Sequence, residues 1–291
     1  MRVVLATRRS PLARAQTDSV RRALVDAGAQ VEVLELVTTG DRWSAEGGPT
    51  PDKGVFVKEL EEALLDGRAD LAVHSAKDLP ADLPDGLAIL ATPRRADARD
   101  VLVGSGNGLD DLPDGARVAT GSPRRSAQLL AERPDLEIVD IRGNVDTRLR
   151  KLGQGVADAL VLAAAGLERL GLEPKGVSFL PADRFVPAPG QGTLAIEGRA
   201  ERDDLRELLE PIADPDTRVC LEAERAVLRA LGGGCREPIG AHCTVAGGRL
   251  DLRLFRSDDG VGTNARHGHL EGVAADPAGP AAEAAKLLAD T

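Results

Sequence analysis

A chain of 291 residues exceeds one ordinary domain of about 100–200 residues, so we expect two or three domains. A hydrophobic fraction of 42% and a charged fraction of 29% are typical of a soluble globular protein without a membrane-spanning helix. A net charge of −10 and an aromatic content of 2% disfavour nucleic acid as a partner. The chain begins without a secretory signal pattern, which favours the cytoplasm.

The first two-thirds of the chain alternates short apolar strands with amphipathic helices, which predicts α/β lobes with largely parallel sheets. We expect strands at residues 3–7, 31–37 and 70–74, and helices at residues 11–27 and 55–65. The segment Ser75-Ala76-Lys77-Asp78 then lies at the carboxyl end of the third strand, where ligands of such sheets bind.

A second unit repeats this order, with strands at residues 117–120 and 137–141, a helix through residue 133 and another at 145–152. Both units leave a strand through a Ser-Pro pair, Ser10-Pro11 and Ser122-Pro123. Serine is a favoured helix N-cap and proline a favoured first helical residue. The sequence therefore predicts two domains of similar build.

Residues 97–100 and 186–192 are the predicted crossings between these domains, and two crossings form a hinge. The C-terminal part of the chain differs from these two domains. Its pattern predicts a helix at 217–231 and a hairpin at 239–245 and 249–255. We expect a small α+β third domain. The predicted division is residues 1–96 with 193–212, residues 97–192, and residues 213–291.

Arginines gather near both predicted helix starts and near the Gly143-Asn144 turn. Residues 117–150 hold seven Arg and no Lys against five Asp or Glu, a net charge of +2 in an acidic chain. The planar guanidinium suits carboxylates, and helix N-termini favour anions. Phosphate is the competing ligand, although no GxGxxG or Walker A pattern occurs. Solvated helix-face charges are the plain alternative for each single arginine.

Asp78, just past a buried strand and beside Lys77, is a candidate catalytic carboxylate that basic neighbours keep ionised. A helix or turn cap is an equally good interpretation from spacing alone. His74 is interpreted as a core histidine. Among the cysteines, Cys235 follows a glycine run and precedes Arg236, a setting that lowers a thiol pKa, whereas Cys220 lies on an apolar stripe. A small buried hydrophobe is the usual role of a lone cysteine.

Six segments together resemble the porphobilinogen deaminases. In chain order these are ATRRSPLA at 6–13, KGVFVKEL at 53–60, VHSAKDLP at 73–80, RGNVDTR at 142–148, APGQG at 188–192 and GGC at 233–235. The resemblance extends from residue 6 to about 245. It implies two lobes like periplasmic binding proteins with a hinge, a small α+β C-terminal domain, and an active site between the lobes.

The resemblance also implies roles for individual residues. Cys235 is expected to carry a covalent dipyrromethane cofactor as a thioether, and Asp78 to be the catalytic carboxylate. The residues expected to hold the cofactor's acetate and propionate groups are Lys77, Ser122, Arg124, Arg125, Asn144 and Arg148. The residues expected near the substrate porphobilinogen are Arg8, Ser10, Arg142, Arg169 and Gln191, with Lys53 and Phe56 on a loop over the cleft.

The implied reaction deaminates porphobilinogen to an azafulvene, which the growing chain attacks before losing a proton. Four rounds and a hydrolysis release hydroxymethylbilane, a step of haem-type tetrapyrrole biosynthesis by a transferase. A cytoplasmic monomer without metal, membrane or nucleic acid is expected. The alternative is a non-enzymatic dicarboxylate-binding or sensor protein with the same two lobes.

Overall fold

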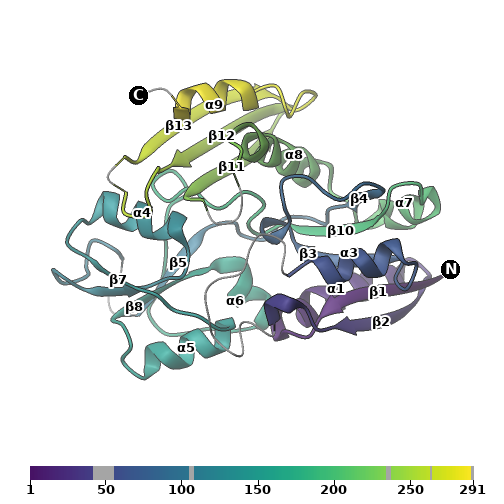
Figure 1. The fold of residues 1–291 in the computed structure, drawn as a ribbon, viewed down its shortest axis with the longest axis horizontal. Helices are drawn as coiled ribbons and strands as arrows, with labels where there is room; N and C mark the ends of the chain where they lie inside the picture. Colours follow the sequence, from purple (N-terminus) through teal and green to yellow (C-terminus); the bar gives the residue numbers. More distant parts are fainter. Residues whose placement is uncertain (42–55, 105–107, 234–236, 263, 290–291) are drawn as a thin grey trace.

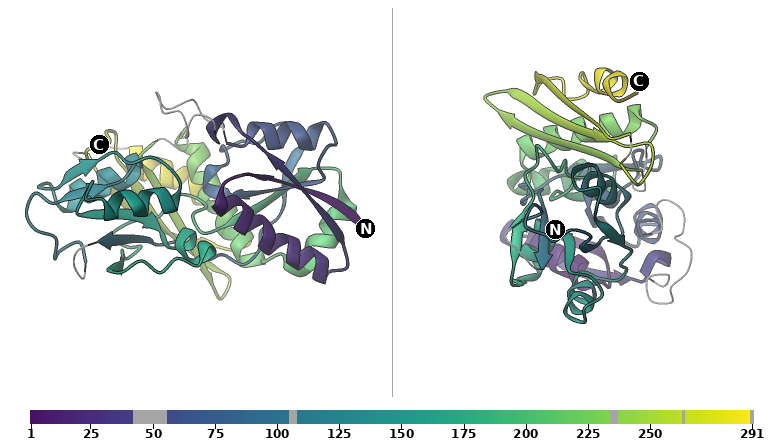
Figure 2. Two further views of the ribbon diagram at one scale, coloured as in Figure 1. Left: turned by 90° about the horizontal axis from the view of Figure 1, so that it is seen from below. Right: turned by 90° about the vertical axis from the view of Figure 1, so that its left-hand side faces the viewer.

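The computed structural model describes residues 1–41, 56–104, 108–233, 237–262 and 264–289. These residues form two five-stranded sheets and one three-stranded sheet. In Figure 1 the first lobe, mainly purple and blue, lies to the right, the teal second lobe to the left, and the yellow-green C-terminal domain above both. Figure 2 shows the same arrangement from two further sides. The predicted fold class, two α/β lobes and a small α+β domain, is confirmed.

The first lobe has the strand order β2-β1-β3-β10-β4. Its strands and helices are β1 (Arg2–Arg8), α1 (Pro11–Asp26), β2 (Gln30–Leu36), α3 (Lys58–Leu65), β3 (Leu71–Ser75), β4 (Leu87–Ala91), β10 (Leu194–Arg199) and α7 (Asp203–Leu209). The strand β1 pairs in parallel with β2 and β3, whereas β10 is antiparallel to β3 and β4. Four of the five strands therefore run in one direction, as the prediction of a largely parallel sheet requires. Only β10 runs against them, because it enters from the other lobe and not through a βαβ crossover.

The second lobe repeats this build with the strand order β7-β6-β8-β5-β9. Its elements are β5 (Asp100–Gly104), β6 (Arg117–Ala119), α4 (Pro123–Glu132), β7 (Glu137–Val139), α5 (Val145–Gly153), β8 (Ala159–Ala163), α6 (Ala164–Leu170) and β9 (Val177–Phe179). Here β6 is parallel to β7 and β8, and β5 is antiparallel to β8 and β9. The strand that arrives from the first lobe again runs against its neighbours.

The C-terminal domain packs two helices on an antiparallel sheet of order β11-β12-β13. Its elements are α8 (Pro215–Ala230), β11 (Ile239–Ala246), β12 (Arg249–Arg256), β13 (Arg266–Val273) and α9 (Ala281–Ala289). The predicted hairpin is confirmed, with Ala246 paired to Arg249 across Gly247 and Gly248, which have φ of 56° and 76°. Both glycines are needed, because this turn requires positive φ at two successive residues.

Several predicted boundaries differ from the structure. The helix expected at 55–65 begins at Lys58, and the strand expected at 137–141 ends at Val139. The helix expected from residue 217 begins at Pro215, because Asp214 caps it by accepting a hydrogen bond from Thr217 N at 2.7 Å. In the described parts of the chain, no helix has the length and apolar character needed to cross a membrane.

Two buried carboxylates, Glu197 of β10 and Glu61 of α3, lie between α3 and the first sheet. Glu197 is 0% exposed and its carboxylate oxygen lies 3.0 Å from His74 Nε2, so the histidine is buried as predicted. Glu61 on α3 is nearly as buried. Burial, followed by the charge of Glu197, raises the pKa of Glu61 from 4.5 to about 7. The folded protein therefore binds a proton at Glu61 more tightly than the unfolded chain.

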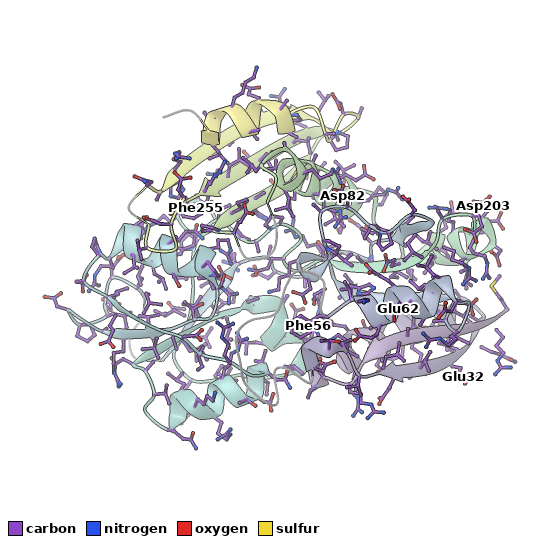
Figure 3. All side chains as sticks on the ribbon, in the orientation of Figure 1. Glu32, Phe56, Glu62, Asp82, Asp203 and Phe255 are labelled. Atoms are coloured by element: carbon purple, nitrogen blue, oxygen red, sulfur yellow. The ribbon has the colours of Figure 1, made fainter. Side chains whose placement is uncertain are left out.

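We expect Glu61→Gln to stabilise the protein at pH 8 but not at pH 4.5. Because the pKa of Glu61 is higher in the folded state, its protonation adds to the free energy of unfolding. This contribution is fully present below pH 4.5 and is lost as the pH rises through about 7. The neutral amide avoids that loss, a gain on the order of 1–2 kcal/mol or a few degrees in Tm. Thermal unfolding at both pH values measures it. Glu62→Gln, on the exposed face of α3 (Figure 3), is the control and should show no such pH dependence.

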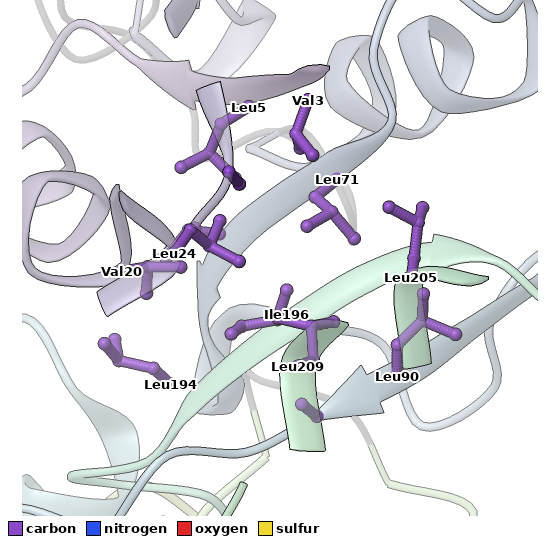
Figure 4. Packing of buried hydrophobic residues seen from close by; sticks show 13 residues of the cluster. Val3, Leu5, Val20, Leu24, Leu71, Leu90, Leu194, Ile196, Leu205 and Leu209 are labelled. Carbon is purple, nitrogen blue, oxygen red and sulfur yellow. The ribbon is translucent and has the colours of Figure 1, made fainter. Parts of the chain in front are cut away.

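The core of the first lobe holds the strand ends that carry the site. Leu5 of β1, Leu71 of β3 and Ile196 of β10 are fully buried against Leu24 of α1 and Leu205 of α7 (Figure 4). Burying such a side chain contributes roughly 1.5–3 kcal/mol. The carboxyl ends of β1 and β3 are thereby fixed side by side, facing the second lobe.

Candidate active site

A cavity of 650 Å³ lies where the two lobes and the C-terminal domain meet. Its wall comes from the short 3-10 helix Ala76–Asp78 after β3, from the starts of α4 and α5, from the segment before β10, and from α8. The described polar residues in this wall are Lys77, Asp78, Ser122, Arg124, Arg125, Arg142, Arg148, Gln191, Arg225 and Glu237. Six of these ten are cations and two are carboxylates, so the cavity suits an anion.

Serine residues cap the two helices that begin at the cavities. Ser10 Oγ accepts a hydrogen bond from Ala13 N at 3.2 Å, and Ser122 Oγ accepts one from Arg125 N at 3.5 Å. Both predicted N-caps are confirmed, each followed by proline. A hydroxyl that accepts from the helix still has its own O–H to donate, so both caps can also bind a carboxylate.

Arg124 and Arg125 lie in the first turn of α4 and are both buried. Their guanidinium groups share one carboxylate: Arg124 Nη2 donates to Asp100 Oδ2 at 2.8 Å, and Arg125 Nη2 donates to Asp100 Oδ1 at 2.8 Å. Each also donates to a backbone carbonyl, Arg124 to Val186 and Arg125 to Val161. The pair lines the cavity, but it is also tied to the second sheet by a residue that the sequence did not single out.

Two further cations of the cavity, Lys77 and Arg148, have lowered affinity for protons. Burial and then the charge of Arg125 lower the pKa of Lys77 to about 8. Burial, followed by Arg125 and Arg142, lowers the pKa of Arg148 to about 10. Both shifts come from desolvation and from like charges held close together, which a bound carboxylate would relieve. The electrostatics of the cavity therefore favour a polyanionic ligand.

A second cavity of 260 Å³ adjoins the first on the side of α1, α5 and α6. Four residues, Lys77, Asp78, Arg125 and Arg148, line both cavities. The predicted substrate residues in its wall are Arg8, Ser10, Phe56 and Arg169, and the predicted cofactor residue Asn144 also lies there. Two ligand units can therefore lie next to each other.

Arg8 is held in the second cavity by two contacts from the same lobe. Its Nη2 donates to Asp41 Oδ1 at 2.6 Å, and its guanidinium carbon lies 4.2 Å from the centre of the Phe56 ring. Arg169 reaches across from α6 and donates to Gly192 O at 2.6 Å. With Nε and Nη2 of Arg8 turned to Asp41 and its face on the Phe56 ring, Nη1 remains as the donor for a ligand.

Asp78 lies at the junction of the cavities. It lines the 650 Å³ and the 260 Å³ cavity and also a pocket of 50 Å³ bounded by Gln16 and His74. Within the described residues its carboxylate has no hydrogen-bond partner, and the 3-10 helix that ends at Asp78 has no side-chain cap. The alternative role as a turn cap therefore finds no support, and the carboxylate faces space that a ligand can fill.

Comparison with known proteins identifies the family. Residues 3–207 match the family model described as porphobilinogen deaminase, dipyromethane cofactor binding domain, and residues 218–287 match its C-terminal domain. The chain belongs to the porphobilinogen deaminase family. The porphobilinogen deaminase of Roseiflexus castenholzii is 48% identical over 296 residues, 99% of this chain and 96% of the relative. That of Rubrobacter xylanophilus is 52% identical over 251 residues, 85% of this chain and 81% of the relative.

Solved structures resemble the chain more distantly. A periplasmic substrate-binding protein of an ABC transporter from Coxiella burnetii has a TM-score of 0.45 and 16% identity, covering 74% of this chain and 94% of that protein. The Bordetella pertussis BvgS VFT2 domain has a TM-score of 0.42, 17% identity, and covers 72% and 84%. We draw no functional conclusion from likeness at this level.

The described residues fit the dipyrromethane cofactor of the porphobilinogen deaminase family. A pair of pyrroles with acetate and propionate groups needs a roomy cavity with several cations, and 650 Å³ with six cationic side chains meets both needs. Arg124 Nε is buried in the described part of the wall without a hydrogen-bond partner, which is unusual for a buried donor. The site therefore has donor capacity beyond what Asp100 accepts.

Most predicted site residues of this family member come together at the two cavities. Cys235 and Lys53 lie outside the described residues. Two acidic residues, Asp100 and Asp41, directly contact the predicted arginines but were not predicted from the sequence. Asp100 opens the apolar run Asp100–Gly104, and a carboxylate at the start of a buried strand is the signal that a charge partner exists. Its partners lie 24 and 25 residues further along the chain, so the sequence could not identify them.

Proposed function

We propose that this chain deaminates porphobilinogen and joins four units head to tail into hydroxymethylbilane, a transferase step of haem-type tetrapyrrole biosynthesis. The observation that carries the proposal is the convergence of six cations from both lobes and the C-terminal domain on one cavity, with Asp78 at its junction with the next. A substrate with two carboxylates explains the cations. A mere dicarboxylate binder would need the cations but not a carboxylate placed among them.

The cofactor is held at one covalent and several ionic contacts. Cys235 forms the thioether, and the acetate and propionate groups are bound by Lys77, Ser122, Arg124, Arg125, Asn144 and Arg148. All of these except Cys235 and Asn144 are in the wall of the 650 Å³ cavity, and Asn144 is in that of the second. When bound, the cofactor supplies the free pyrrole α-position to which the first substrate unit is joined.

The incoming porphobilinogen binds in the second cavity, next to the cofactor. Its carboxylates and ring are held by Arg8, Ser10 and Arg169 in the wall of the second cavity, and by Arg142 and Gln191 in the wall of the first. We also assign Phe56, and Lys53 outside the described residues, to substrate binding. The support is the wall that the two cavities share, because it lets a substrate unit lie against the end of the growing chain. Phe56 keeps Arg8 extended along its ring, which orients the guanidinium edge.

Asp78 is the catalytic carboxylate. Its oxygens accept hydrogen bonds from pyrrole N–H groups and stabilise the positive charge that develops when the substrate loses ammonia. The same carboxylate then accepts the proton that leaves the α-carbon after the new bond forms. The arginines around it fix the substrate, so that the charge of Asp78 acts mainly in the transition state.

The three parts of the chain divide this work. We assign residues 1–96 with 193–212 and residues 97–192 to the two lobes, and residues 213–291 to the domain that anchors the cofactor. The sheet membership of β1–β4 with β10, and of β5–β9, supports this division. We further propose a cytoplasmic monomer that binds neither nucleic acid nor membranes, since a net charge of −10 is repelled by both.

The intact mass of the purified chain tests the proposed function. We expect one adduct of two linked pyrroles per chain, mapped to a single cysteine peptide, and the release of hydroxymethylbilane when porphobilinogen is added. A chain of unmodified mass that binds porphobilinogen without converting it would instead favour the non-enzymatic binder.

A further inference from the structure

Asp100 is the first residue of β5 and is 0% exposed. Its Oδ1 accepts hydrogen bonds from Arg125 Nε at 3.1 Å, Arg125 Nη2 at 2.8 Å and Gln191 Nε2 at 2.8 Å. Its Oδ2 accepts one from Arg124 Nη2 at 2.8 Å. One buried carboxylate thus serves two cations of the cofactor cavity and the amide of a residue before β10.

We propose that Asp100 is a positioning residue, which orients the guanidinium groups of Arg124 and Arg125 toward the cofactor cavity and balances half of their charge before a carboxylate ligand arrives. The inference rests on the proposed function of the cavity. It assigns a role to a residue that touches neither cofactor nor substrate.

The charge balance at this position explains why such a residue is needed. Two guanidinium groups in the first turn of α4 repel each other and also meet the positive end of the helix dipole. Burial opposes the ionisation of Asp100, but the charges of Arg124 and Arg125 outweigh it and hold the pKa of this carboxyl well below its usual range. The carboxylate is therefore ionised at neutral pH and keeps the pair at a net charge of +1.

The geometry also couples the two lobes. Asp100 can only accept, so Gln191 must turn its Nε2 toward this carboxylate and toward Ala98 O at 2.7 Å. Gln191 Oε1 then faces the first lobe, where it accepts a hydrogen bond from Lys77 Nζ at 3.2 Å. Asp100 therefore sets the position of cations in both lobes, Lys77 through Gln191 and the arginine pair directly.

The test compares Asp100→Asn with the unchanged chain in two forms, cofactor-free protein from cells that make no porphobilinogen and the same protein loaded by adding porphobilinogen. Intact mass verifies the loading. Asparagine keeps the shape but leaves the arginines unneutralised, so the cofactor-free variant should melt roughly 10 °C lower. The carboxylates of the loaded cofactor supply the missing charge, so loading should raise the Tm of the variant more than that of the unchanged chain.

One control variant and two contrary outcomes complete the test of Asp100. Asp97→Asn removes the partner of Arg99 from an exposed pair three residues earlier and should leave the gain in Tm on loading unchanged. A purely structural Asp100 would lower both forms equally, and this result would overturn the proposal. Failure of the unchanged chain to take up any adduct would instead contradict the proposed function.

A double variant covers the case in which Asp100→Asn does not fold. Changing Arg125 to Met in the same chain removes one unpaired cation, so the double variant should recover folding or melt above the single variant. A double variant no more stable than the single one would show that Asp100 does not act through the arginine pair. It would overturn the proposal without any measurement of activity.

Discussion

Asp78→Asn is expected to give a folded, cofactor-loaded protein that has lost nearly all turnover. The amide keeps the shape of the side chain but not the charge that stabilises the developing cation. Loss of one such stabilising group typically costs a factor of about 10²–10³ in rate, and loss of proton transfer adds a factor of about 10²–10⁴. Single-turnover kinetics with porphobilinogen on loaded protein measure the chemical steps directly.

If Asp78 acted only as a turn cap, the opposite result would be expected for the same variant. Asparagine is itself a good cap, so a capping Asp78 could be replaced with nearly normal turnover and a loss of roughly a few tenths of a kcal/mol in stability. Asp82 is an exposed carboxylate four residues later (Figure 3), and Asp82→Asn is the matched control that should turn over normally. A near-normal rate for Asp78→Asn would remove Asp78 from the mechanism.

Cys235→Ala is expected to abolish both the covalent adduct and all activity. The thioether needs a thiol at the attachment point, and no other residue can replace it, so the loss should be complete. Intact mass and peptide mapping report the adduct, and turnover of porphobilinogen reports the activity.

The other two cysteines are the controls for this prediction. Cys220 and Cys243 are 6% and 1% exposed in the core of the C-terminal domain, where α8 packs on β11. The hydrogen bond with Cys220, followed by burial, raises the pKa of the Cys243 thiol far above its usual range, which makes it a poor nucleophile. Cys220→Ala and Cys243→Ala should keep the adduct and the activity. An adduct recovered on Cys243 would contradict the assignment of Cys235.

The sequence by itself determined the local features of this protein. The Ser-Pro pairs predict the starts of α1 and α4 correctly, because an N-cap serine and a first-turn proline act within four residues. Gly247-Gly248 predicts the hairpin for the same reason. The family segments bring with them the candidate site residues, including Asp78 and the arginines of α4. Each of these signals is carried by neighbouring residues and needs no knowledge of distant partners.

Only the tertiary structure decided what those residues contact. Each sheet is largely parallel as predicted, but the opposite direction of β10 in one and of β5 in the other depends on where these strands arrive from. The pairing of Arg8 with Asp41 joins residues 33 apart in the chain, and that of Gln191 with Asp100 joins residues 91 apart. A buried carboxylate must find cationic and hydrogen-bonding partners, but any of several could serve, and only the packing of the two lobes brings these ones within reach.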